Sequence, residues 1–126
     1  MFRLLITLSA VAALAACASE PGRAIQGLFS PSKGQAALEA GVQQYQDGDY
    51  ADSAKSISAA LDQGLDDSQQ VRAHKYLAFI SCASNRLGVC REEFRKALAI
   101  NPSFELSAAE AGHPTWGPIF RQLKPR

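Results

Sequence analysis

Apolar residues in the middle of the chain recur every three or four positions, which is the spacing of one face of an α-helix. Four such stripes follow one another, separated by turn sequences at residues 47–49, 64–67 and 85–88. The stripes are Ala37, Leu38, Gly41, Val42 and Tyr45; Tyr50, Ala54, Ile57, Ala60 and Leu61; Val71, Tyr76, Leu77, Phe79, Ile80 and Ala83; and Cys90, Phe94, Ala97, Leu98 and Ile100. No segment alternates with a period of two, so the predicted fold class is all-α, with two helical hairpins.

The residues after the fourth stripe predict a C-terminal cap. Pro102 stops the preceding helix, because proline cannot continue it. Ser107 and Glu110 have the spacing of a capping box, which predicts a short helical turn. A last helix is expected at about residues 115–123, with Trp116 packed on the second hairpin. The alternative is that Trp116 is an exposed aromatic anchor for a partner.

The N-terminus has the three parts of a secretory signal. Arg3 is followed by an apolar run over residues 4–13, which is too short to span a membrane. Leu14-Ala15-Ala16-Cys17 then matches the pattern that bacterial lipoprotein processing recognises. We therefore expect residues 1–16 to be a signal peptide and Cys17 to become the lipid-bearing N-terminus. The alternative is an ordinary cleaved signal with a chance cysteine.

The residue after Cys17 is Ala18 rather than Asp. By resemblance to sorted lipoproteins, this favours an outer-membrane anchor facing the periplasm over retention at the inner membrane. Residues 17–33 are rich in Ser, Pro and Gly with little periodicity, which predicts a flexible linker behind the lipid. The folded domain is expected to cover residues 34–126, a length sufficient for one small domain.

Charge is balanced overall but unevenly distributed. The chain has 13 Lys and Arg residues against 12 Asp and Glu residues, and Arg3 belongs to the predicted signal peptide. Nucleic-acid binding, which needs a basic surplus, is therefore not expected. Residues 47–67 are mainly acidic and residues 72–96 mainly basic. Two solvated helix faces are the simplest interpretation of this division.

Cys82 and Cys90 would lie on the two helices of the second hairpin, near its turn. That geometry permits a disulfide, and the expected periplasmic location favours one. The alternative is two buried free thiols that pack as small hydrophobic side chains. No further ligands are spaced for a metal site, so none is predicted.

The hairpins carry the pattern of tetratricopeptide repeats. Gly41, Gly48-Asp49-Tyr50, Ile57 and Ala60-Leu61 resemble one repeat, and Leu77-Ala78, Cys90, Phe94, Ala97-Leu98 and Asn101-Pro102 resemble a second. The resemblance implies small residues at the closest helix crossings and a cap after the last repeat. Two positions depart from the pattern: Ser53 replaces a small apolar residue, and Leu65 replaces proline.

A closer resemblance covers the C-terminal half of the chain. Its residues are 75–79, 82, 90–97, 101–106, 111–114, 116–118 and 120. Together with the lipoprotein pattern, they resemble the small tetratricopeptide lipoproteins of the TssQ type, which are associated with type VI secretion systems. This implies an accessory envelope protein that binds other subunits of that machine. The alternative is a scaffold lipoprotein of a pilus, outer-membrane or cell-wall assembly machine.

In tetratricopeptide proteins the first helix of each repeat lines a concave groove. The corresponding groove residues in this chain are Leu38, Val42, Tyr45, Arg72, Lys75 and Phe79. Arg72 and Lys75 are one turn apart, so we expect them to reach one acidic group of a partner helix or peptide. The alternative is that Leu38, Val42 and Phe79 pack in the core or under the N-terminal linker.

No catalytic residues are predicted, because the sequence has no nucleophile elbow, metalloprotease helix or phosphate loop. An envelope hydrolase is therefore the least favoured function. His74 and His113 have no ligand or carboxylate at a useful spacing and are interpreted as structural. The expected partners are the membrane, through the lipid, and protein subunits; no cofactor, small-molecule substrate or nucleic acid is expected.

Overall fold

The computed structural model describes residues 30–126. Within this range it contains α-helices and no strands, which confirms the predicted all-α class. The predicted signal peptide, Cys17 and most of the predicted linker lie outside the described residues. The helices are α2 (Lys33–Gln46), α3 (Tyr50–Gln63), α4 (Asp67–Ala83), α5 (Leu87–Ile100), α6 (Ala108–Ala111) and α7 (Trp116–Leu123).

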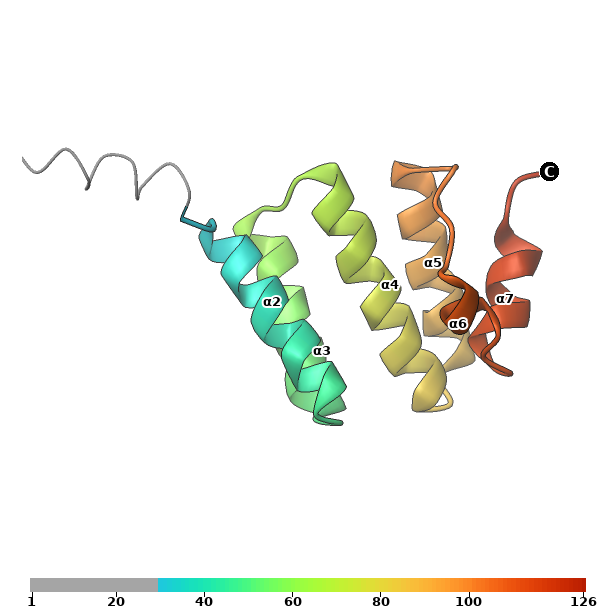
Figure 1. Ribbon diagram of the computed structural model, residues 1–126, viewed down its shortest axis with the longest axis horizontal. Helices are drawn as coiled ribbons and strands as arrows, with labels where there is room; N and C mark the ends of the chain where they lie inside the picture. The colour runs from blue at the N-terminus through green and yellow to red at the C-terminus, as the bar shows by residue number, and fades with distance from the viewer. Residues whose placement is uncertain (1–29) are drawn as a thin grey trace, which may run out of the picture. The chain divides into compact units, whose positions relative to one another are not determined.

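The helices form two antiparallel hairpins and a C-terminal extension (Figure 1). Helices α2 and α3 make the first hairpin, and α4 and α5 make the second. Helix α4 contacts both helices of the first hairpin, while α7 packs against α5 and α4. The last helix was expected at about residues 115–123 and lies at Trp116–Leu123, so this prediction is confirmed.

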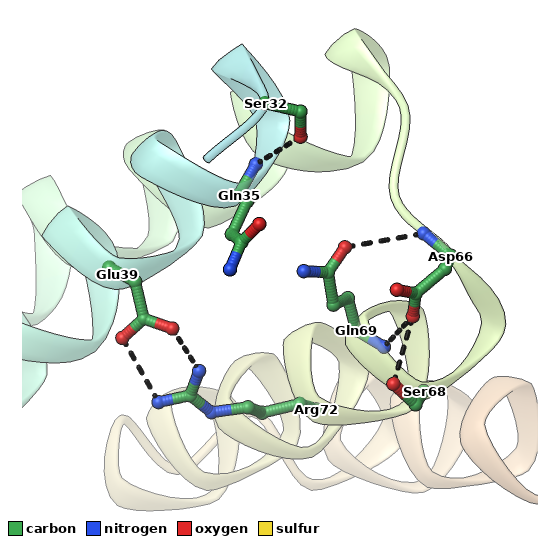
Figure 2. Close-up of polar contacts among 7 residues, drawn as sticks. All are labelled: Ser32, Gln35, Glu39, Asp66, Ser68, Gln69 and Arg72. Carbon is green, nitrogen blue, oxygen red and sulfur yellow. Dashed lines mark hydrogen bonds and ion pairs between the residues drawn. The ribbon is translucent and has the colours of Figure 1, made fainter. Parts of the chain in front are cut away.

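Side-chain caps fix where several of these helices begin. Ser32 Oγ accepts the backbone N–H of Gln35 at the start of α2. At the start of α4, Asp66 and Gln69 form a reciprocal capping box, shown in Figure 2. The predicted capping box of Ser107 and Glu110 is also present, at the start of α6. Each cap satisfies N–H groups that have no partner within the helix.

The core consists of two clusters that meet at α4. One lies among α2, α3 and α4, with the fully buried Leu38, Ile57 and Ala60. The other lies among α4, α5 and α7, where the Phe79 ring stacks on Trp116 at a centroid distance of 4.3 Å. The Trp116 indole Nε1–H donates to the Glu110 carbonyl oxygen at 2.8 Å. Trp116 is therefore a packed cap residue rather than an exposed anchor.

The two helices of the first hairpin approach closely at Gly41. A methyl group added there would lie 2.5 Å from Ile57 Cγ1, so only glycine fits without movement. The buried Ser53 hydroxyl donates to the Gly41 carbonyl oxygen at 2.6 Å. This bond explains why serine is accepted at a position where the repeat pattern has a small apolar residue.

Replacing Gly41 with alanine is expected to lower the free energy of unfolding by about 1–3 kcal/mol, because the added methyl group overpacks the crossing with Ile57. Gly88→Ala in α5 is the matched control. Nothing lies within 4 Å of a methyl group at Gly88, so this change should not destabilise the protein; the gain in helix propensity should be below about 1 kcal/mol, because Gly88 is the second residue of α5. Urea unfolding followed by circular dichroism measures both. Equal changes in the free energy of unfolding for the two variants would show that α2 and α3 are farther apart at Gly41 than described.

Candidate interaction surface

The second hairpin is closed by its two cysteines. The sulfur atoms of Cys82 and Cys90 lie 2.02 Å apart, at disulfide-bond distance, and their Cα atoms lie 5.2 Å apart. The structure thus brings together the pair that the sequence predicted. Both side chains are buried in the core between α4 and α5. The bridge holds the end of α4 against the start of α5, at the opposite end of this hairpin from the groove described below.

Three of the six predicted groove residues are not on the surface. Leu38, Val42 and Phe79 are only 0%, 4% and 2% exposed, and they pack in the two core clusters. Their assignment to a partner groove was wrong, and the alternative of core packing is correct. The reason is geometric: the face of α2 that carries Leu38 and Val42 is covered by α3 and α4, so no partner can reach it.

The other three predicted residues lie at or near the surface. Tyr45 is half-buried, and its ring contacts Tyr50 and Tyr76 at centroid distances of 5.3 and 5.1 Å. Burial raises the pKa of Tyr45 to about 12, with smaller contributions from Tyr50, Tyr76 and Glu110. Tyr45 therefore stays protonated and joins α2 to α4 through aromatic contact.

Arg72 connects the two hairpins. Its guanidinium donates two hydrogen bonds to the Glu39 carboxylate, one of them from Nη2 to Oε2 at 3.3 Å (Figure 2). The hydrogen bond with Glu39 raises the pKa of Arg72 above its ordinary value. The two side chains are 38% and 53% exposed, so the pair contributes at most about 1 kcal/mol to stability.

Lys75 pairs with the carboxylate of Glu110, which lies in the short helix α6 of the C-terminal cap. Its Nζ donates to Glu110 Oε2 at 2.9 Å, while Glu110 Oε1 accepts the backbone N–H of Ser107. Burial raises the pKa of Glu110, but the hydrogen bonds from Lys75 and Ser107 outweigh it and leave the pKa below its ordinary value. Arg72 and Lys75 were expected to share one acidic group. That expectation concerns a partner and stays a prediction; within the chain each cation binds a different carboxylate.

A groove of about 480 Å³ lies beside these two cations. Its apolar residues are Val71 on α4, Ile100 at the end of α5 and Phe104 in the following loop; Asp67, Ser68, Arg72, Lys75 and Asn101 complete the lining. Ile100 and Phe104 were not predicted to belong to a binding surface. The one signal available was local rather than periodic: Phe104 is an apolar residue two positions after the helix-stopping Pro102.

A second groove, of about 560 Å³, is lined by α3, α4 and α5 together with Arg86. Glu93 lies at its edge and is nearly buried, but both of its oxygens are occupied. His74 Nδ1 lies 2.7 Å from Glu93 Oε2, and Lys96 Nζ donates to Oε1 at 3.1 Å. Burial raises the pKa of Glu93, and the bonds with His74 and Lys96 lower it further than burial raises it.

Both histidines have structural surroundings. His74 pairs with Glu93, and the His113 ring stacks on Trp116 with centroids 3.3 Å apart. His113 Nδ1 also accepts the backbone N–H of Thr115 at 3.1 Å. In residues 30–126, no group of three or more His, Cys, Asp or Glu side chains is arranged to hold a metal ion. None of the helices in the same range is long and apolar enough to cross a bilayer.

The chain was compared with protein-family models, with curated proteins and with solved structures. None of the three comparisons found a match. The candidate interaction surface is therefore described from this chain's own geometry: the ion pair between α2 and α4, the ion pair between α4 and α6, and the groove beside them. Such a surface can bind another chain, through apolar contact in the groove and charged contact at its edge.

Proposed function

We propose that the protein is a lipid-anchored envelope protein that binds another protein through the groove beside Arg72 and Lys75. In this proposal it is an accessory lipoprotein of a type VI secretion system, held in the outer membrane by lipid on Cys17. The support is the lipoprotein pattern at residues 14–17 and the resemblance over residues 75–120. The succession of α2–α3 and α4–α5 hairpins supports the tetratricopeptide interpretation on which this resemblance rests.

The observation that carries the proposal is an apolar groove with two cations at its edge. Val71, Ile100 and Phe104 supply apolar surface, and Arg72 and Lys75 lie beside it. Such a groove fits a helix or peptide that places an apolar side chain next to a carboxylate. Because apolar and charged contacts are both required, the groove would select such a segment over a purely acidic one.

The chain's own carboxylates show which chemistry the two cations bind. Glu39 reaches Arg72 from α2, and Glu110 reaches Lys75 from the start of the C-terminal cap. Glu39 is largely exposed, so exchanging it for a partner's carboxylate costs little, since exposed ion pairs contribute only about 0–1 kcal/mol. Glu110 is held more firmly, because it also caps α6. We therefore expect the partner carboxylate to bind Arg72.

The partner can be captured by a photo-crosslinking amino acid placed at Asp67, an exposed residue at the edge of the groove. The matched control is the same amino acid at Ala99, an exposed α5 residue that lines neither groove. Adducts isolated from cells and identified by mass spectrometry should be secretion-machine subunits, and they should form from position 67 only. Adducts to a pilus, outer-membrane or cell-wall machine would overturn the assignment to secretion while keeping the groove.

Arg72→Glu is expected to reduce partner capture about tenfold, because it removes the cation and places a second carboxylate beside Glu39. Arg95→Glu is the control, since Arg95 is an exposed arginine on α5 that also pairs with a glutamate but lies outside the groove. Both variants should keep the helical circular dichroism of the parent protein. Normal capture by a folded Arg72→Glu variant would show that the groove is not the binding surface.

A further inference from the structure

The two hairpin turns lie at the same end of the molecule, the lower edge in Figure 1. The first turn joins α2 to α3, and the second joins α4 to α5. Tyr50 and Val89 are the exposed large apolar residues of the described chain, with 39% and 44% of their surfaces exposed. Each lies in the first helical turn that follows one of these hairpin turns. Both of these exposed apolar side chains are thus near one edge, and Val89 also lines the groove of about 560 Å³.

The two turns carry opposite charge. The acidic turn, residues 47–52, holds Asp47, Asp49 and Asp52; the basic turn, residues 84–91, holds Arg86 and Arg91. Within residues 30–126, none of these five side chains takes part in an ion pair, although six ion pairs form elsewhere. Both turns therefore present charge that the folded chain does not neutralise.

We propose that this edge binds a second copy of the chain. A two-fold rotation would place the acidic turn of one copy against the basic turn of the other, and the same contact would form twice. Each contact would bring Tyr50 and its neighbouring aspartates against Val89 and its neighbouring arginines. An apolar centre with charged surroundings is the usual arrangement of a protein–protein interface.

The placement of the two turns is the reason to choose a second copy over an unrelated partner. The turns complement each other in charge, and each carries one exposed apolar side chain. They lie on the same edge of the two hairpins (Figure 1), and the described residues form no ion pair between them. A second copy in the two-fold arrangement satisfies both turns at once, whereas an acidic or a basic partner satisfies only one.

The geometry can be tested with cysteine crosslinking of the full chain. Two differently tagged copies, one with Tyr50→Cys and one with Val89→Cys, are produced together and oxidised after lysis in mild detergent. A disulfide-linked heterodimer should dominate. The control pairs Tyr50→Cys with Ala99→Cys, because Ala99 is exposed on the same helix as Val89 but near its other end. Equal crosslinking of the two pairs would overturn the proposal.

Charge reversal tests the cause of association. Asp49→Arg with Asp52→Arg makes both turns of a copy basic, and Arg86→Glu with Arg91→Glu makes both acidic. Either variant alone should associate about tenfold more weakly than the parent, since like charges then face each other. A mixture of the two variants should recover the parent's association, because every contact is again between opposite charges. Failure of the mixture to recover, with each variant folded by circular dichroism, would refute the proposal.

Discussion

Replacing Phe79 with alanine is expected to lower the free energy of unfolding by about 3–5 kcal/mol, the range for truncating a large buried aromatic residue. Phe79 is almost fully buried, and its ring contacts Tyr45, Tyr76, Phe94 and Trp116. It therefore connects α4 to α2, α5 and α7 at one point. A loss of this size is a large share of the stability of a small domain. Urea unfolding, followed by far-UV circular dichroism, measures it.

Phe79→Leu is the matched control and should cost clearly less than Phe79→Ala, because most of the buried volume remains. The pair also separates core from binding surface. Any loss of partner capture in Phe79→Ala should follow the unfolded fraction and be absent in Phe79→Leu. If Phe79→Ala retained the parent's stability but lost its partner, Phe79 would be a contact residue and its placement in the core would be wrong.

Removing the bridge between Cys82 and Cys90 is expected to lower the free energy of unfolding by about 2–3 kcal/mol, because the unfolded chain regains the entropy of a short open loop. The bridged residues are separated by 8 positions. Alanine at both positions keeps the site apolar, so the loss reports mainly on the crosslink. Denaturant midpoints of the parent and the double variant, measured without reductant, give the difference.

A reductant provides the internal control for this experiment. It should lower the denaturant midpoint of the parent by a similar amount and leave the double variant unchanged. If the reductant left the denaturant midpoint of the parent unchanged, the two cysteines would not be bridged in the purified protein.

The helices could be predicted from the sequence because their apolar spacing is regular and their ends carry strong local signals. The capping box of Ser107 and Glu110 depends on residues three positions apart, and the structure has it as predicted. The cysteine pair was also found in advance, since a helical hairpin brings residues on either side of a short turn together. These features depend on short stretches of chain, so local reasoning was sufficient for them.

The candidate interaction surface was harder to predict because it depends on contacts between distant segments. Leu38, Val42 and Phe79 have the same apolar character as groove residues, and only the packing of α2 against α3 and α4 shows that they are buried. The pairing of Lys75 with Glu110 joins residues 35 positions apart. Phe104 lies in a loop without periodicity, so no pattern assigned it to a surface.

The crosslink between Cys82 and Cys90 also bears on the order in which the molecule folds. In the unfolded chain it already keeps the end of α4 beside the start of α5, so this hairpin has lost its loop-closure entropy before folding begins. Forming the α4–α5 hairpin first therefore costs the least conformational entropy, and the first hairpin and α7 can then pack against its two sides. Because neighbouring helices make most of the contacts, the mean sequence separation of contacting residues is small, which is typical of chains that fold in microseconds to milliseconds.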